Sequence, residues 1–166
     1  MNLTLDEAIK VLEMQEEILQ FSHFTNDDAW ELGNIIVTAA KKLDVTIATS
    51  IKLNSGYTVF QHGFDGTNLV NEKWMDRKFN IVKVTEKSSL YAAMLLQRSE
   101  ETLEDWGLNA KDYAACGGGF PIRVEEVGVI GAVVITGLDH VTDHDLLIKC
   151  ISKYLHVDEV PRIKAM

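Results

Sequence analysis

Two pairs of strand-like segments, each joined by a short turn, constrain the fold of this chain more than any other feature. Residues 45–53 (VTIATSIKL) alternate apolar side chains with others, which is the period of a strand with one buried face. The Asn-Ser-Gly turn at 54–56 leads directly into YTVFQ and so predicts an antiparallel hairpin. FPIRV at 120–124 and GVIGAVVITG at 128–137 predict a second strand pair. We therefore expect an antiparallel sheet.

Helical periodicity fills the segments around and between these strand pairs. Thr4 and Glu7 match the pattern of a capping box, which predicts a helix start near the beginning of the chain. The expected helices cover about residues 5–19, 25–43, 70–84, 88–101 and 142–155. Long parallel crossovers are not evident in this order of elements. The predicted fold class is α/β in the broad sense, an α+β arrangement with a small antiparallel sheet and helices on its faces.

Composition limits the class of protein. A length of 166 residues favours a single domain spanning residues 1–166. The formal net charge of −9 argues against nucleic acid and anionic membranes as partners, because both bind basic surfaces. The start of the chain is acidic where a signal peptide is basic, and no apolar run is long enough to span a bilayer. The predicted location is therefore the cytoplasm, where the two cysteines are expected as free thiols.

The segment ACGGGFPIRV contains three consecutive glycines, Gly117, Gly118 and Gly119. Unhindered N–H groups in such a run can bind an anion or a carbonyl group. The alternative is a sharp bend that lets another element approach closely, and the sequence leaves both explanations open. Phe120 is expected in the core, with a place on a ligand-binding wall as the alternative. Cys116 is expected to be a buried, unreactive thiol, because nothing beside it predicts a lowered pKa.

A basic stretch, KWMDRKFN at residues 73–80, stands out in this acidic protein. It combines Trp74 with Arg77 and Lys78, and these side chains could hold a carboxylate or phosphate ligand. The alternative is a solvated basic helix face with Trp74 packed into the core. We keep Trp74, Arg77 and Lys78 as candidate ligand-binding residues.

Two histidines near the end of the chain, His140 and His144, are spaced like metal ligands on one helical face. His140 falls in the turn before the helix predicted to begin near Thr142, so no metal site is predicted. His144 is retained as a candidate binding residue that makes a hydrogen bond or an ion pair with Asp143 or a neighbouring subunit. No nucleophile–base pattern or pair of acids stands out, and no catalytic residue is predicted.

Several of these motifs together resemble the UPF0303 family, within the GlcG/HbpS-like, haem-degrading-domain superfamily. The strongest parts are GGGFPI at 117–122 and the Gly-Leu…Asp-His turn within residues 137–144. WMDRKFNIVKVTEKSSLYAAMLL at 74–96 is similar to the family's central helices. The resemblance implies a profilin-like fold with a five-stranded antiparallel sheet between helices, and homo-oligomers built from dimers. It also implies haem as a possible cofactor, although this chain has Cys116 where relatives often have histidine.

Three functions remain open on these grounds. The first is a cytoplasmic homo-oligomer that binds a small anionic molecule through the amides of Gly117–Gly119 and the cations of Arg77 or Lys78. The second is a protein that binds or degrades haem, whose carboxylates the same cations would meet. The third is a non-catalytic assembly or interaction protein, in which the glycines serve only subunit packing. The sequence does not identify the ligand, a catalytic activity or the number of subunits.

Overall fold

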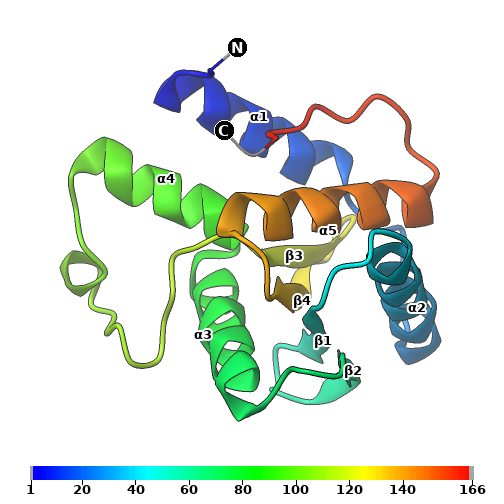
Figure 1. The fold of residues 1–166 in the computed structure, drawn as a ribbon. Coiled ribbons are helices and arrows are strands. Elements are labelled where there is room, and N and C mark those ends of the chain that lie inside the picture. The colour runs from blue at the N-terminus through cyan, green and yellow to red at the C-terminus, as the bar shows by residue number, and fades with distance from the viewer. Residues whose placement is uncertain (1, 165–166) are drawn as a thin grey trace.

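The computed structural model of the protein describes residues 2–164. Within that range, four strands form one antiparallel sheet in the order β2-β1-β4-β3 (Figure 1). The strands are β1 (Ala48–Leu53), β2 (Thr58–Gly63), β3 (Gly119–Val124) and β4 (Gly128–Thr136). β1 and β2 form the first predicted hairpin, and β4 pairs with both β1 and β3. The antiparallel sheet and both predicted strand pairs are thus confirmed.

The expected helices all form. They are α1 (Leu5–Ile18), α2 (Asn26–Lys42), α3 (Leu69–Thr85), α4 (Ser89–Ser99) and α5 (His140–Leu155). The predicted capping box of α1 is present, because the Thr4 hydroxyl accepts from the Glu7 N–H and the Glu7 carboxylate accepts from the Thr4 N–H. A short 3₁₀ helix, η1 (Glu104–Trp106), lies in the long connection between α4 and β3.

The two faces of the sheet carry different helices (Figure 1). Successive side chains of a strand point to opposite faces. Ile51 of β1 and Val133 of β4 therefore share a core with α2 and α5, whereas Ala48 and Val134 share a second core with α3. Lys52 follows Ile51 and so lies on the α3 face, which brings a cation from the sheet to the side of that helix.

A third hydrophobic cluster lies between α1 and α4. Helices α1 and α4 pack together through residues such as Leu12 and Leu90, and the C-terminal segment closes this cluster with Ile163. Two polar contacts hold the segment in place. The Gln15 amide donates to the Pro161 carbonyl oxygen at 2.8 Å, and Arg162 forms a bidentate ion pair with a carboxylate of α5 at 2.7 Å. The end of the described chain is therefore part of the packed structure.

The sheet has one strand fewer than the family resemblance implied. The fifth position, at the outer edge of β3, is held by Phe21 alone, which forms an isolated bridge with Val124. The Phe21 N–H donates to the Arg123 carbonyl oxygen at 2.8 Å, and its own carbonyl accepts from the Glu125 N–H at 2.8 Å. The connection from α1 to α2 covers only residues 19–25, so it crosses the edge without running along it. The expectation of five strands was wrong for this reason.

Helix α5 begins two residues before the predicted start near Thr142. Asp139 is its N-cap, and the Asp139 carboxylate accepts from the Thr142 N–H at 3.1 Å. An aspartate is a strong capping residue because its oxygen satisfies N–H groups that have no partner within the helix. The earlier start places His140 in the first turn of the helix and not in the turn before it.

Candidate functional site

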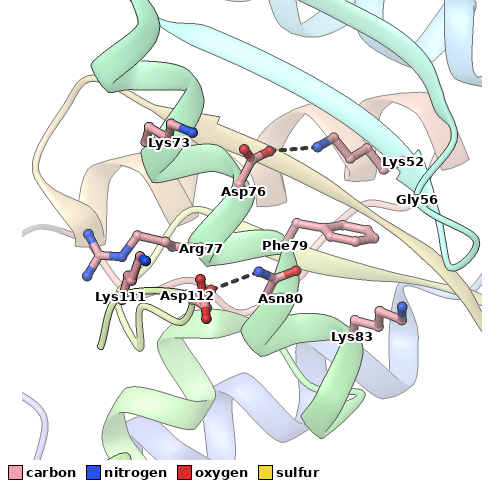
Figure 2. Close-up of a pocket in the computed structure, with 10 residues that line it drawn as sticks. All are labelled: Lys52, Gly56, Lys73, Asp76, Arg77, Phe79, Asn80, Lys83, Lys111 and Asp112. Atoms are coloured by element: carbon pink, nitrogen blue, oxygen red, sulfur yellow. Dashed lines mark hydrogen bonds and ion pairs between the residues drawn. The ribbon is translucent and has the colours of Figure 1, made fainter. Parts of the chain in front are cut away.

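Helix α3 carries the candidate site, because its two sides meet different surroundings. Met75, Phe79 and Val82 are buried in the core beneath the sheet. A groove of about 670 Å³ lies along the outward side of the helix (Figure 2). Its charged lining consists of Lys52, Lys73, Asp76, Arg77, Lys83, Lys111 and Asp112. The groove is therefore basic in a protein whose formal net charge is −9.

Acidic partners neutralise little of this positive charge. Lys52 Nζ lies 2.7 Å from Asp76 Oδ1 and 5.6 Å from the centre of the Phe79 ring (Figure 2). The other cations have no ion pair within residues 2–164, and they are Lys73, Arg77, Lys83 and Lys111. Like charges that share one concave surface repel each other and attract counter-ions. The groove thus has the electrostatic character of an anion-binding site.

Arg77 is held in place by an aromatic ring. Its guanidinium lies over the indole of Trp74, with Cζ 4.4 Å from the ring centre. This cation–π contact restricts the side chain before any ligand arrives. The Arg77 Nε is buried and has no hydrogen-bond partner among the described residues. Trp74 is 39% exposed, so the alternative that placed it in the core does not hold.

The loop after η1 forms the other wall of the groove. The Asn80 amide donates to the Asp112 carbonyl oxygen at 2.8 Å (Figure 2). The Ala114 N–H donates to the carbonyl oxygen of Arg77 at 3.2 Å. These two bonds tie the loop to α3 and bring Lys111 to the same groove.

The glycine loop makes internal hydrogen bonds. The Gly117 N–H donates to Nδ1 of His140 at 3.1 Å, and the Gly119 N–H donates to the Ser89 hydroxyl at 2.8 Å. The carbonyl of Gly118 accepts from the Ile135 N–H at 2.7 Å. The amides of Gly117 and Gly119 are therefore already engaged within the fold.

Close packing also surrounds all three glycines. A Cβ at Gly117 would collide with the backbone carbonyl of His140, and one at Gly118 with that of Ile135. A Cβ at Gly119 would lie 2.8 Å from a methyl group of Val82. The close approach of other elements, which was one of the two explanations considered, is sufficient to account for the three glycines.

Lys78 lies on a different side of α3 from Arg77. It is 3% exposed, and its Nζ donates to the Ile135 carbonyl oxygen at 2.9 Å and to the Asp143 carboxylate at 3.1 Å. Burial raises the pKa of Asp143 to about 6, and the neighbouring Lys78 partly opposes that effect. The pair joins α3 to the end of β4 and the start of α5.

The last two predicted residues, Phe120 and His144, lie in the core. Phe120 is buried, and its ring centre lies 6.2 Å from that of His144. His144 Nε2 lies 2.8 Å from the side-chain oxygen of Gln15, and Nδ1 has no partner among the described residues. Burial lowers the pKa of His144 to about 4, so the imidazole is neutral at pH 7. The partner of His144 is thus Gln15, which the sequence did not predict, and not Asp143, which pairs with Lys78.

A second cavity of about 450 Å³ lies beside the glycine loop. Trp74, Lys78, Cys116 and His140 are among its lining residues. Arg77 and Lys78, which the sequence grouped as cations of one ligand site, therefore lie apart, with Arg77 in the basic groove and Lys78 in this cavity. Cys116 is a free thiol but only half-buried, so the expected full burial was wrong; its partial burial still raises the pKa of the thiol.

Sequence reasoning missed two cations of the basic groove, Lys52 and Lys111. Lys52 is separated from Asp76 by a turn, a strand and the start of a helix. The alternation in residues 45–53 places Lys52 on the strand face opposite the apolar side chains, and this was the one sequence signal for its position. Lys111 lies in a polar stretch without periodicity, so no local pattern places it near α3.

Comparisons with known proteins agree with this architecture. The sequence pattern of the family described as "Haem degrading protein HbpS-like" matches residues 24–152. A UPF0303 protein of Yersinia enterocolitica is 35% identical over 154 residues, covering 92% of this chain and 91% of the relative. Among solved structures, the Ybr137w protein has a TM-score of 0.82 at 27% identity, covering 89% of this chain and 88% of that one.

A more distant structure shares the fold alone. It is a crystal structure described as a "PduOC:Heme Complex", with a TM-score of 0.66 at 19% identity, covering 78% of this chain and 93% of that one. No helix within residues 2–164 is both long and apolar enough to cross a membrane. From the sequence matches, the chain belongs to the HbpS-like family and is a member of its UPF0303 group.

Proposed function

We propose that this chain binds a small anionic molecule in the basic groove along α3. The observation that carries the proposal is the set of four groove cations that have no acidic partner within residues 2–164. The groove volume of about 670 Å³ falls in the range of about 300–1,000 Å³ that is common for small-molecule sites. Arg77, already stacked on Trp74, supplies a fixed guanidinium for the anion.

Calorimetric titration with orthophosphate, sulfate and citrate tests this function. A triple variant with Lys73→Gln, Lys83→Gln and Lys111→Gln should bind the best of these probes about tenfold more weakly, since exposed ion pairs contribute about 0.2–1 kcal/mol each. Lys42→Gln, at the exposed end of α2, removes a cation elsewhere and should leave affinity unchanged. Equal affinity of the triple variant and the natural protein, with both folded, would rule out the groove.

Haem is the second candidate, supported by the family description and by the fold shared with the haem complex. Haem iron needs an axial group such as an imidazole nitrogen or a thiolate. Nδ1 of His140 accepts the Gly117 N–H, so in the neutral ring the proton is on Nε2 and neither nitrogen has a free lone pair. Burial raises the pKa of Cys116 and keeps it a thiol. In this arrangement neither residue fits an axial role.

Titration with hemin distinguishes the first two candidates. We expect the Soret band of free hemin to remain unshifted when the protein is added. A shifted Soret band that His140→Ala abolishes would show that the loop opens to release this nitrogen, and it would place haem ahead of a small anion.

We further propose that copies of this chain associate in the cytoplasm. The support is a group of large apolar residues in the first turns of α3, where Leu69 is 73% exposed and Val70 is 64% exposed beside the half-exposed Trp74. Exposed apolar residues that lie together mark contact surfaces. Native mass spectrometry should detect an oligomer that Leu69→Gln weakens, and a monomer at micromolar concentration would contradict this proposal.

A further inference from the structure

We infer that the ligand of the basic groove is a molecule with two or more phosphoryl groups arranged in line along α3. This inference rests on the proposed function and narrows it from any small anion to a polyphosphorylated one. Three features of the groove carry it: the amount of uncompensated charge, the spacing of the cations and the position of the acids.

The amount of charge exceeds what a single carboxylate or phosphate can match. Four cations lack an acidic partner within the described range, and Asp112 is the single acid of the groove without an ion pair there. A carboxylate supplies one negative charge and orthophosphate fewer than two at pH 7, since the second pKa of a phosphate group is about 6. A chain of phosphoryl groups comes closer to neutralising the groove.

The spacing of the cations requires an extended ligand. At a rise of about 1.5 Å per residue, Lys73 and Lys83 are attached about 15 Å apart along the axis of α3. Arg77 lies between them, and Lys111 reaches the groove from the facing loop (Figure 2). A single tetrahedral anion can contact one part of this spread of cations, whereas linked phosphoryl groups can contact more than one of them.

The acidic residues indicate where phosphoryl groups do not bind. The negative charge of Asp76 is matched by Lys52 at 2.7 Å, so the sheet side of the groove is close to neutral. Asp112 lacks an ion pair within residues 2–164 and lines the loop wall, where its backbone carbonyl accepts from the Asn80 amide. The Asp112 carboxylate suits a ligand hydroxyl, which can donate to it, whereas Lys111 on the same loop suits a phosphoryl group. The inferred ligand is therefore a phosphate ester with a hydroxyl group that lies toward Asp112.

A series of inorganic probes tests the linear arrangement. Orthophosphate, pyrophosphate and tripolyphosphate would be titrated into the whole protein at one ionic strength and pH. We expect affinity to rise along the series, with tripolyphosphate binding about tenfold or more tightly than orthophosphate. Lys73→Gln and Lys83→Gln, at the two ends of this spread of cations, should each reduce this ratio, whereas Lys42→Gln should leave it unchanged.

The outcomes separate the two proposals. Equal affinity for all three phosphates, lost in the groove variants, would overturn the linear ligand and leave the anion-binding function intact. Failure of the folded protein to bind any of the phosphates, sulfate or citrate would overturn both. If Lys42→Gln lowers the ratio of tripolyphosphate to orthophosphate affinity as much as Lys73→Gln or Lys83→Gln does, general surface charge is responsible. That outcome would also overturn the inference.

Discussion

Gly118 illustrates how tightly the glycine loop is packed. Its φ is +126°, a conformation that residues with a side chain rarely adopt. The backbone carbonyl of Ile135 lies where a Cβ would be placed, and Lys78 Nζ would be 2.7 Å from that Cβ. Conformation and packing therefore both require glycine at this position.

Gly118→Ala should lower the free energy of unfolding by about 1–3 kcal/mol through backbone strain, and by more through the contact with Ile135. Gly107→Ala is the matched control, because Gly107 also has a positive φ, +77°, and a Cβ added there would have no other atom within 4 Å. Urea unfolding measures both variants. Equal losses in the two variants would contradict the packing argument.

Glu16 is a buried carboxyl group with an unusual titration. It is 8% exposed, and its carboxylate accepts from the Ser88 N–H at 3.2 Å. Burial raises the pKa of Glu16 from 4.5 to about 7. The folded state thus binds this proton more tightly than the unfolded state. The contribution of Glu16 to stability is largest below pH 4.5 and decreases as the pH rises from 4.5 to about 7.

Glu16→Gln should remove this pH dependence and raise the free energy of unfolding at pH 8 by up to about 3 kcal/mol. The amide keeps an oxygen for the Ser88 N–H and has no charge to bury. Chemical unfolding at pH 5 and pH 8 measures the difference, with the exposed Glu17→Gln as the control. A variant that loses as much stability between these pH values as the natural protein would contradict the assignment to Glu16.

At the scale of elements, the geometry of α3 explains why two neighbouring candidate residues do not share one site. Periodicity predicted the helix within about a residue at each end. Consecutive helical residues are rotated by about 100°, so Arg77 and Lys78 had to meet different surroundings. The partners of Lys78, at Asp143 and Ile135, are distant in the sequence, and no local pattern predicts them. Lys52 is also distant in the sequence from the groove residues of α3, so its contribution to the groove was not predicted.

The C-terminal segment acts as a structural element although it has no regular secondary structure. Ile163 is 3% exposed and closes the cluster between α1 and α4. Ile163→Ala should lower the free energy of unfolding by about 2–5 kcal/mol, as expected for a buried aliphatic side chain. Lys164→Ala, at an exposed neighbour, is the control. Thermal and urea unfolding would contradict this role if the two variants were equally stable.

At the scale of the whole molecule, the layers differ in how they connect to the sheet. The two cores around the sheet share β1 and β4, whereas the cluster of α1, α4 and Ile163 contains no strand residue. Local opening should therefore be easier in the outer layer. We expect amide hydrogen exchange to be slowest in β4 and clearly faster in α1. Equal protection of both elements, measured by mass spectrometry, would show that the layers unfold as one unit.

Sequence patterns could predict the elements of the molecule more completely than their arrangement. Alternation in residues 45–53 and the turn after it identified a hairpin, because both signals are local. The order of the strands depends on the pairing of β1 with β4, which joins segments far apart in the chain. The single bridge at Phe21 depends on the length of one connection and on burial of that side chain. Neither feature has a periodic signal.

The contact between Arg77 and Trp74 has a practical consequence. The indole lines the cavity beside the glycine loop, while the guanidinium stacked on it lines the basic groove. An anion that binds the stacked guanidinium would change the electric field at the indole. The fluorescence of Trp74 should therefore report anion binding at Arg77. Comparison with Trp74→Phe would separate the emission of Trp74 from that of the other two tryptophans.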